Sequence, residues 1–262
     1  HYYNPKGSGE YGSLSANAVS RKNALGTLIL TLNTTFGRRQ GLFRGQVVPS
    51  NATHAAEIEV TVCTTGEAHL VKELRLPPHF YHHRTTAAEP MFLGFECHEL
   101  FKERLGQFDY YCYLEDDIAV QDPMFFHKLD WFNGLTGDEA VLQPNRYELA
   151  VGQPVEKLYI DGTLRRREWS ERWQDVSDRT VIEAEALGVP LVFRRVNNPH
   201  SGCFFLNGRQ MAHWAAQPTF LRSEAAITAD TRDHRSYPRH GFVYRAALTD
   251  YNDRTTGAFS FR

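Results

Sequence analysis

Three consecutive carboxylates, Glu115, Asp116 and Asp117, directly follow five apolar or aromatic residues at 110–114. Like charges this close repel one another, so the sequence predicts a positive group beside them. Mg²⁺ and Mn²⁺ prefer a few carboxylates together with substrate phosphate and water. The triplet therefore indicates a divalent-cation site in which the ion also contacts the phosphates of a bound ligand.

The elements around the triplet must place it at the edge of a sheet. If residues 110–114 form a strand that is buried on both faces, the three carboxylates emerge together where that strand ends. Ligands of open α/β sheets bind outside the carboxyl ends of the strands. We therefore expect the binding site at this strand end.

Strand and helix patterns alternate along the chain. Periodicity predicts helices at 20–37, 90–106, 123–134 and 208–217, and strands at 56–63, 108–114, 139–147 and 203–207. This alternation is typical of an α/β fold, in which helices cover a sheet. We expect 1–262 to form a single domain, with halves at 1–150 and 151–262. The charged stretch within 152–189 is interpreted as an insertion or a lid.

Composition excludes some classes of partner. The 29 Lys and Arg residues nearly balance the 31 Asp and Glu residues of this 262-residue chain, so no net field favours nucleic acid. No run approaches the roughly 18 apolar residues of a membrane span. The widely spaced cysteines Cys63, Cys97, Cys112 and Cys203 are expected to be free buried thiols. We expect a cytoplasmic protein. Because the chain begins at His1, a lumenal domain trimmed from a membrane anchor is the alternative.

The segment "YLEDDIAVQDPMFFHKL", residues 113–129, resembles the signature of nucleotide-sugar-dependent glycosyltransferases of the GT-A fold. Its local form is close to that of the N-acetylglucosaminyltransferase I family. The wider resemblance covers about the first 150 residues, because the order of elements is also similar. It implies a mixed, mainly parallel sheet flanked by helices. It also implies metal-dependent transfer of a sugar from a nucleotide-diphosphate sugar to a saccharide, a glycan or another hydroxyl acceptor.

The resemblance gives roles to the acidic residues. Asp117 would be the direct ligand of Mn²⁺ or Mg²⁺, and Glu115 and Asp116 would face the ribose or the water shell of the metal. His240 is a candidate further metal ligand, because several GT-A families bring a late His to the ion. The alternative for His240 is an ordinary hydrogen-bonded or surface histidine.

Basic and acidic residues elsewhere complete the hypothesis. Arg21 and Arg84 are candidate diphosphate ligands, because a guanidinium is a planar donor suited to phosphate oxygens. If the reaction inverts configuration, the acceptor hydroxyl needs a general base. Glu224 is the first candidate, on a helix with Ser223 as its N-cap, and Asp230 is the second. Glu224 could instead simply complement the dipole of that helix.

Two other classes of function stay open. A nucleotidyltransferase shares a similar scaffold and acidic metal site, and the glycine-containing segment 4–12 faintly resembles the phosphate loop of such enzymes. A non-catalytic GT-A-like domain would bind a cation or a saccharide without turnover. Release of nucleoside diphosphate from a nucleotide sugar would distinguish the glycosyltransferase from both.

Overall fold

The structure is a computed structural model of the whole chain. It describes residues 1–6, 12–14, 17–52, 55–150, 152–162, 181–196, 202–216, 220–230, 243–253 and 260–261, the last three ranges by their backbone alone. The chain separates into two compact units, His1–Met211 and Ala212–Arg262, and each is described by itself. The expected single domain with a division near residue 150 stays a prediction.

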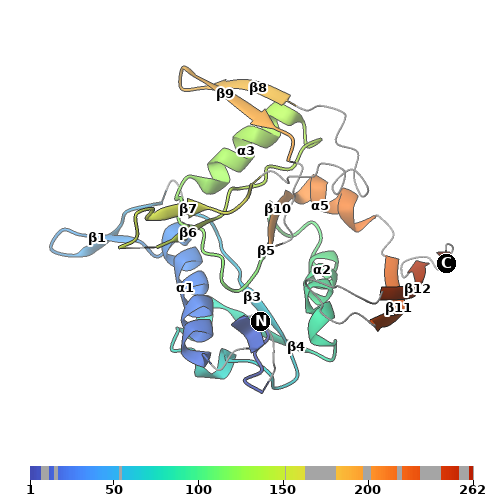
Figure 1. Cartoon of the computed structure of the whole chain (residues 1–262). Coiled ribbons are helices and arrows are strands. Elements are labelled where there is room, and N and C mark those ends of the chain that lie inside the picture. Colours follow the sequence, from blue (N-terminus) through green and yellow to red (C-terminus); the bar gives the residue numbers. More distant parts are fainter. Residues whose placement is uncertain are drawn as a thin grey trace. The chain divides into compact units, whose positions relative to one another are not determined.

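Helices and short strands alternate along the first unit (Figure 1). The helices are α1 (Ala18–Phe36), α2 (Leu93–Glu103) and α3 (Phe125–Thr136), with 3₁₀ turns at Gly12–Leu14, Val71–Glu73, Pro78–Phe80 and Pro90–Phe92. Helix α5 (Gly208–Ala215) begins in this unit and ends beyond its last residue, Met211. The strands are β1 (Gly41–Phe43), β2 (Val47–Pro49), β3 (Thr61–Thr65), β4 (His82–Thr86), β5 (Tyr110–Leu114), β6 (Tyr147–Leu149), β7 (Lys157–Tyr159), β8 (Val181–Ala186), β9 (Val189–Arg194) and β10 (Cys203–Asn207). No helix within the described ranges is long and apolar enough to cross a membrane.

Helix α1 forms where the sequence predicted it, because local signals mark its start and its end. The side chain of Asn17 accepts a hydrogen bond from the backbone N–H of Ser20, which caps the first turn. At the other end, a Cβ on Gly37 would lie 2.4 Å from the carbonyl oxygen of Asn33, so only glycine fits there. Its core-facing residues are Leu25, Leu28, Ile29 and Phe36.

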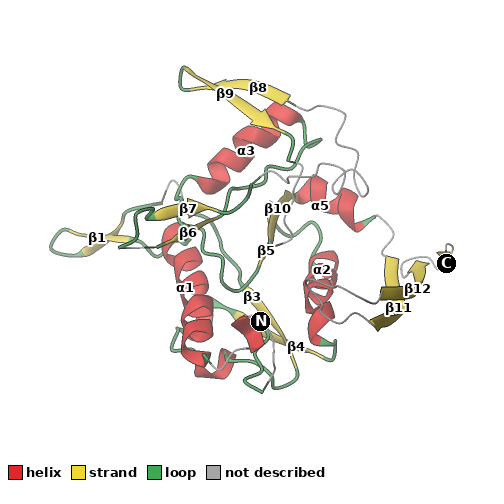
Figure 2. Cartoon of the chain, viewed as in Figure 1, coloured by secondary structure: helices red, strands yellow, loops and turns green. Residues whose placement is uncertain are grey.

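The predicted α/β class is confirmed, but the arrangement of the strands differs from the expected mainly parallel sheet. Figure 2 shows the strands of the first unit as short separate pairs. Among the described strands, β3 and β4 form the parallel pair, and all other pairings are antiparallel. Strand β5 pairs with β10, with Cys112 opposite Phe205. Periodicity predicts that a strand is buried, but it does not identify the neighbour or its direction.

Two predicted strands have different bounds in the structure. The segment 139–147 is mostly irregular, and β6 begins only at its last residue, because Pro144 cannot donate to a ladder. The predicted strand 56–63 is replaced by β3, which starts at Thr61. Residues 57–60 are not part of a strand and line a cavity, and the carbonyl of Val60 accepts from the N–H of His82, at 2.7 Å.

The second unit corrects one prediction about the site. The helix expected to start after Ser223 and to carry Glu224 is instead part of strand β11 (Phe220–Asp230), which pairs antiparallel with β12 (Val243–Asp253) along its whole length. Strand β13 (Ser260–Phe261) pairs with β12. Cross-strand pairing outweighs the helical tendency of the alanines in this segment. Ser223 is therefore not a helix cap, and Glu224 lies opposite Thr249 in a strand.

The apolar core beneath the acidic triplet can be tested at Leu129, which is 1% exposed and packs with Phe36, Val120 and Phe205. We expect Leu129→Ala to lower the free energy of unfolding by about 3 kcal/mol, because it removes buried methyl groups and leaves a cavity. Chemical denaturation measures this loss. Leu135 on the same helix is 44% exposed, so Leu135→Ala serves as the control and should cost less than about 1 kcal/mol. Equal losses would contradict this description of the core.

Candidate functional site

The acidic triplet follows β5 as predicted, and β10 fixes its starting point. The backbone N–H of Glu115 donates to the carbonyl of Gly202, at 2.8 Å, which extends the β5–β10 ladder by one step. The N–H of Ile118 then donates to the carbonyl of Glu115, at 3.1 Å, and turns the chain after the strand. The triplet therefore begins at the end of the ladder, where the chain turns away from the strand.

The positive group that the triplet required is the guanidinium of Arg21, on the first turns of α1. Its Nη1 donates to Oδ2 of Asp117, at 3.0 Å, and its Nη2 contacts Oδ1 of Asp116. The side chains of Arg21 and Asp116 are each only 15% exposed, whereas that of Asp117 is 51% exposed. The buried Nε of Arg21 has no hydrogen-bond acceptor within the described residues. The guanidinium thus holds two carboxylates through its two Nη atoms.

His1 joins the triplet to the neighbouring strand β3. Its backbone nitrogen donates to the carbonyl of Cys63, at 2.6 Å, and its Nδ1 contacts Oδ2 of Asp116. The other ring nitrogen accepts from the N–H of Leu70, at 3.3 Å, and the imidazole side chain is fully buried. Both carboxylate oxygens of Asp116 are therefore occupied, by Arg21 and by His1, which makes Asp116 a positioning residue.

Glu115 and a second arginine, Arg146, both lie next to Gly202. A Cβ on Gly202 would lie 2.9 Å from both Oε2 of Glu115 and Nη1 of Arg146, so both side chains crowd against this glycine. Arg146 is in turn held by Asp161: Nη2 and Nε donate to Oδ1, at 2.8 and 3.1 Å, and the backbone N–H donates to Oδ2, at 2.6 Å. The side chain of Asp161 is only 7% exposed. This ion pair closes the base of the β6–β7 hairpin beside the triplet.

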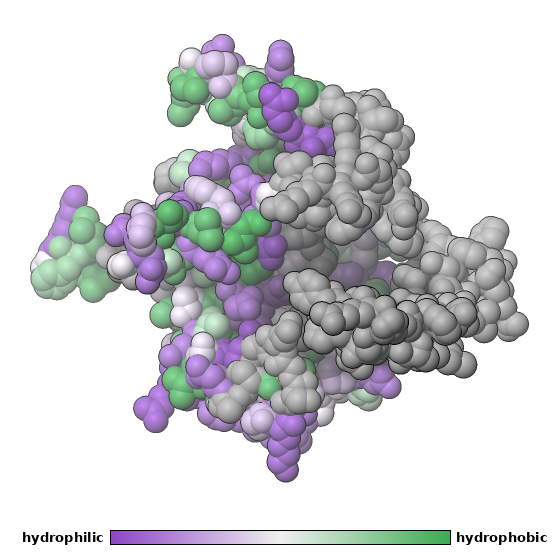
Figure 3. Space-filling view, viewed as in Figure 1, coloured by the Kyte–Doolittle hydropathy of each residue, from purple (hydrophilic) through white to green (hydrophobic). Residues whose placement is uncertain are grey.

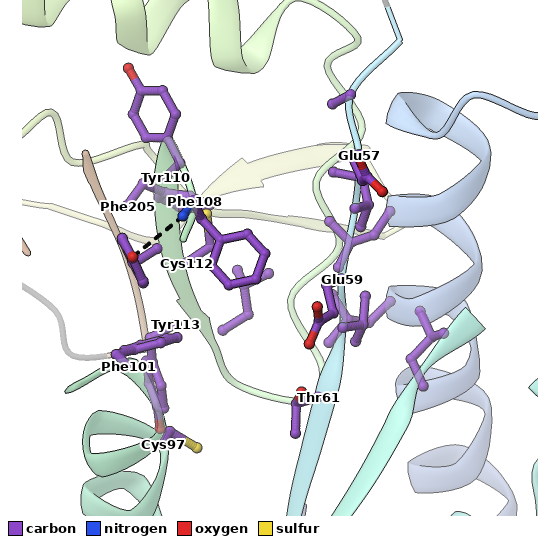
Figure 4. A pocket seen from close by; sticks show the side chains of 18 of the residues that line it. Glu57, Glu59, Thr61, Cys97, Phe101, Phe108, Tyr110, Cys112, Tyr113 and Phe205 are labelled. Carbon is purple, nitrogen blue, oxygen red and sulfur yellow. Dashed lines mark hydrogen bonds between the residues drawn. The ribbon is translucent and has the colours of Figure 1, made fainter. Parts of the chain in front are cut away.

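A cavity of about 730 Å³ opens between β3 and β5 (Figure 4). Residues 55–63 line one wall and 108–114 line the other, with Cys97 and Phe101 of α2 adding to the lining. Aromatic rings project from the second wall, and carboxylates project from the first. Asp116 also lines the cavity, whereas Glu115 and Asp117 are not among the lining residues, so the cavity reaches the triplet at Asp116.

The residues fit an ion that takes most of its ligands from phosphate and water. Within the parts of the chain that the structure describes, no group of three or more His, Cys, Asp or Glu side chains is arranged to hold a metal. Asp117 is a half-exposed carboxylate with one oxygen on Arg21. A single carboxylate with substrate phosphates is a usual way for Mg²⁺ to bind, so Asp117 suits that role better than Asp116 or Glu115.

The other predicted site residues are not all near the triplet. Arg84 on β4 forms a bidentate ion pair with Glu103, the last residue of α2, with donor–acceptor distances of 2.5 and 2.8 Å. Its expected role as a diphosphate ligand stays a prediction. The side chains of Glu224 and Asp230, and the whole of His240, lie outside what the structure describes. Their predicted roles stay predictions.

Sequence reasoning missed three contributors: His1, Arg146 and Asp161. Arg146 and Asp161 are 15 positions apart and become neighbours only because the β6–β7 hairpin brings its ends together. A hairpin pattern with an Arg before it and an Asp after it was the available signal. His1 carried no signal, because its partners lie 62 and 115 positions away.

Two thiols lie together where β3 meets α2. The cysteines are free, as predicted, although Cys97 and Cys112 are only partly buried. The thiol of Cys97 donates to the carbonyl of Leu93, at 3.8 Å, and its interaction with Cys63 lowers the pKa of Cys63 and raises the pKa of Cys97. Burial raises the pKa of Cys112 to about 12 and that of Cys203 to about 11. Cys63 is therefore the first of the four to ionise.

Cys97→Ala removes the thiol that lowers the pKa of Cys63, so we expect the thiolate of Cys63 to form at a higher pH than in the unchanged protein. A thiolate that accepts a hydrogen bond is stabilised, and losing the bond raises its pKa. Thiolate absorbance near 240 nm, followed as the pH rises through neutrality, measures the shift. Cys112→Ala is the control and should leave the first step in place. If the first ionisation step is unchanged in Cys97→Ala, then Cys97 does not lower the pKa of Cys63.

Comparison of the chain with protein-family models, with curated proteins and with solved structures finds no match.

Proposed function

We propose that the chain is a divalent-metal-dependent glycosyltransferase, which moves a sugar from a nucleoside-diphosphate sugar to a hydroxyl of a saccharide or another acceptor. The observation that carries this proposal is Arg21, which holds Asp116 and Asp117 while its buried Nε–H lacks an acceptor within the described residues. A buried N–H without an acceptor is costly, and a phosphate oxygen would satisfy it. A guanidinium that can bind an anion and an exposed carboxylate thus lie side by side.

The proposal gives each residue of this cluster a separate task. Asp117 binds Mg²⁺ or Mn²⁺, and the ion stabilises the negative charge that gathers on the departing diphosphate. Arg21 binds a diphosphate oxygen through its guanidinium. Asp116 keeps the guanidinium in place, since both of its oxygens are occupied. Glu115 and Arg146 form the neighbouring wall next to Gly202.

The adjoining cavity supplies room for the nucleoside. Its volume of about 730 Å³ is typical of small-molecule sites. Its lining includes Phe101, Phe108 and Tyr113, whose rings offer surfaces on which a base can stack. Asp116 and His1 also line the cavity, and Asp116 contacts Arg21, so the cavity lies close to that guanidinium. If the reaction inverts configuration, Glu224 and Asp230 remain the candidate general bases from the resemblance.

The test is release of nucleoside diphosphate. The chain is incubated with a panel of nucleotide sugars and Mn²⁺, with and without a glycan acceptor panel. The proposal predicts release with at least one donor, and loss of that release when the metal is chelated. Consumption of nucleoside triphosphate with release of pyrophosphate would favour a nucleotidyltransferase instead. Metal or saccharide binding with neither activity would favour a binding domain.

Arg21→Gln tests the observation that carries the proposal. We expect binding of nucleoside diphosphate to weaken by about 10- to 100-fold, because a charge-assisted hydrogen bond is lost. Lys22→Gln is the matched control on the same helix: Lys22 lies 3.7 Å from Glu73, in an exposed ion pair. The affinity of Lys22→Gln for nucleoside diphosphate should change by less than about threefold. Isothermal titration measures both, and equal effects in the two variants would remove Arg21 from the site.

A further inference from the structure

The β1–β2 hairpin exposes large apolar side chains at its tip. Phe43 and Val47 are each 75% exposed, and Leu42 is 44% exposed. Phe43 and Val47 are direct cross-strand partners and therefore share one face of the hairpin. Gly45, with φ of +76°, closes the turn between them. Figure 3 shows this hairpin as a hydrophobic projection, coloured green at the left of the view.

Basic residues surround the apolar tip. Arg38, Arg39 and Arg44 are exposed, and residues 38–50 contain no Asp or Glu. Arg38 lies 3.6 Å from Glu57, but the two side chains are 69% and 83% exposed, so this pair is weak and easily exchanged. Arg39 contacts the ring of His79. The hairpin therefore carries a net positive charge around an apolar face.

Two other hairpins of the same unit expose apolar residues but have the opposite charge. The β6–β7 hairpin, 147–159, carries Glu148 and Glu156 against one Lys. The β8–β9 hairpin, 181–194, exposes Val189 and carries two Glu residues against one Arg. Exposed apolar surface alone is thus not special in this unit. The combination of apolar tip and arginines distinguishes β1–β2 from both.

We infer that the β1–β2 hairpin docks on an anionic lipid surface, with its apolar tip in the membrane interface and its arginines at the headgroups. A three-residue strand spans about 10 Å. That length matches the depth of about 5–10 Å to which interfacial segments enter a bilayer. Apolar burial and attraction of basic residues to anionic lipid act together in such segments. This inference is independent of the proposed enzymatic function.

The test is sedimentation of the chain with vesicles of phosphatidylcholine containing about one-third phosphatidylserine, an anionic lipid. We expect binding to these vesicles, and much weaker binding to phosphatidylcholine alone or at high salt. The double variant Phe43→Ser, Val47→Ser should lose at least about tenfold in partitioning, since each buried apolar side chain contributes strongly. Arg44→Gln should lose about fivefold.

Matched variants make the outcome decisive. Val189→Ser, at an apolar position of the acidic β8–β9 hairpin, should partition like the unchanged protein. Circular dichroism checks that each variant is folded. Equal loss in Val189→Ser and in the Phe43 and Val47 variant would overturn the inference. Absence of binding to the anionic vesicles would also overturn it. Self-association of the chain, or binding of a single-stranded oligonucleotide, would then show that the hairpin has a different partner.

Discussion

Asp117→Asn is expected to remove Mn²⁺-dependent binding of nucleoside diphosphate and to reduce sugar transfer by at least about 10²-fold. The amide keeps the shape of the side chain but loses the charge that attracts the ion. The free energy of unfolding should change by less than about 1 kcal/mol, because Asp117 is half-exposed and its ion pair with Arg21 is screened by solvent. Thermal melts with nucleoside diphosphate, with and without Mn²⁺, measure binding and stability together.

Asp122→Asn is the matched control for this experiment. Asp122 lies five positions further along the loop between β5 and α3 and pairs with Lys128, with both side chains substantially exposed. Its side chain accepts a hydrogen bond from the N–H of Met124, at 2.9 Å, just before α3 begins. The amide oxygen of asparagine can accept the same bond. A metal-dependent thermal shift that persists in Asp117→Asn, or that is equally lost in Asp122→Asn, would exclude Asp117 as the metal ligand.

Arg146→Met is expected to give the largest loss of stability among the charged residues of the site, about 3 kcal/mol. Methionine fills a similar volume, but it leaves the 7%-exposed carboxylate of Asp161 without its guanidinium. A buried carboxylate that loses its cation is strongly destabilised, whereas replacing both members of a pair is much less costly. Chemical denaturation at neutral pH measures the difference.

Two further variants separate this effect from a general loss of charge. Arg146→Met combined with Asp161→Leu should recover part of the lost stability, because no unpaired charge is then buried. Lys128→Met breaks an exposed pair and should cost less than about 1 kcal/mol. If Arg146→Met costs no more than Lys128→Met, the ion pair does not hold the base of the hairpin.

Local elements could be read from the sequence, whereas their partners could not. Helix α1 follows from its periodicity, and Asn17 and Gly37 limit it through atoms a few positions away. The strand before the acidic triplet was equally plain. Its pairing with β10 was not, because burial on both faces says nothing about which strand lies alongside. The expected helix at Glu224 was wrong for the same reason: a pairing partner 25 positions away decides its structure.

The candidate site was predicted in part. The repulsion among three carboxylates correctly required a positive charge, but the sequence could not choose between a bound ion and a side chain. The structure brings Arg21 to Asp116 from 95 positions away. It also directs Arg84, an equally plausible cation in the sequence, to Glu103. Such choices depend on which helix lies against which strand, and that information is absent from local patterns.

The cavity between β3 and β5 has a consequence for hydrogen exchange. Strand β3 pairs with β4 on one side, and β5 pairs with β10 on one side, while residues of both line the cavity. Amides that face a solvent-filled space exchange faster than amides held in a ladder. A nucleotide that fills this space should therefore slow exchange at 57–63 and 110–114 together, although these segments are far apart in the chain. Filling the cavity would make the two strands open as one cooperative unit.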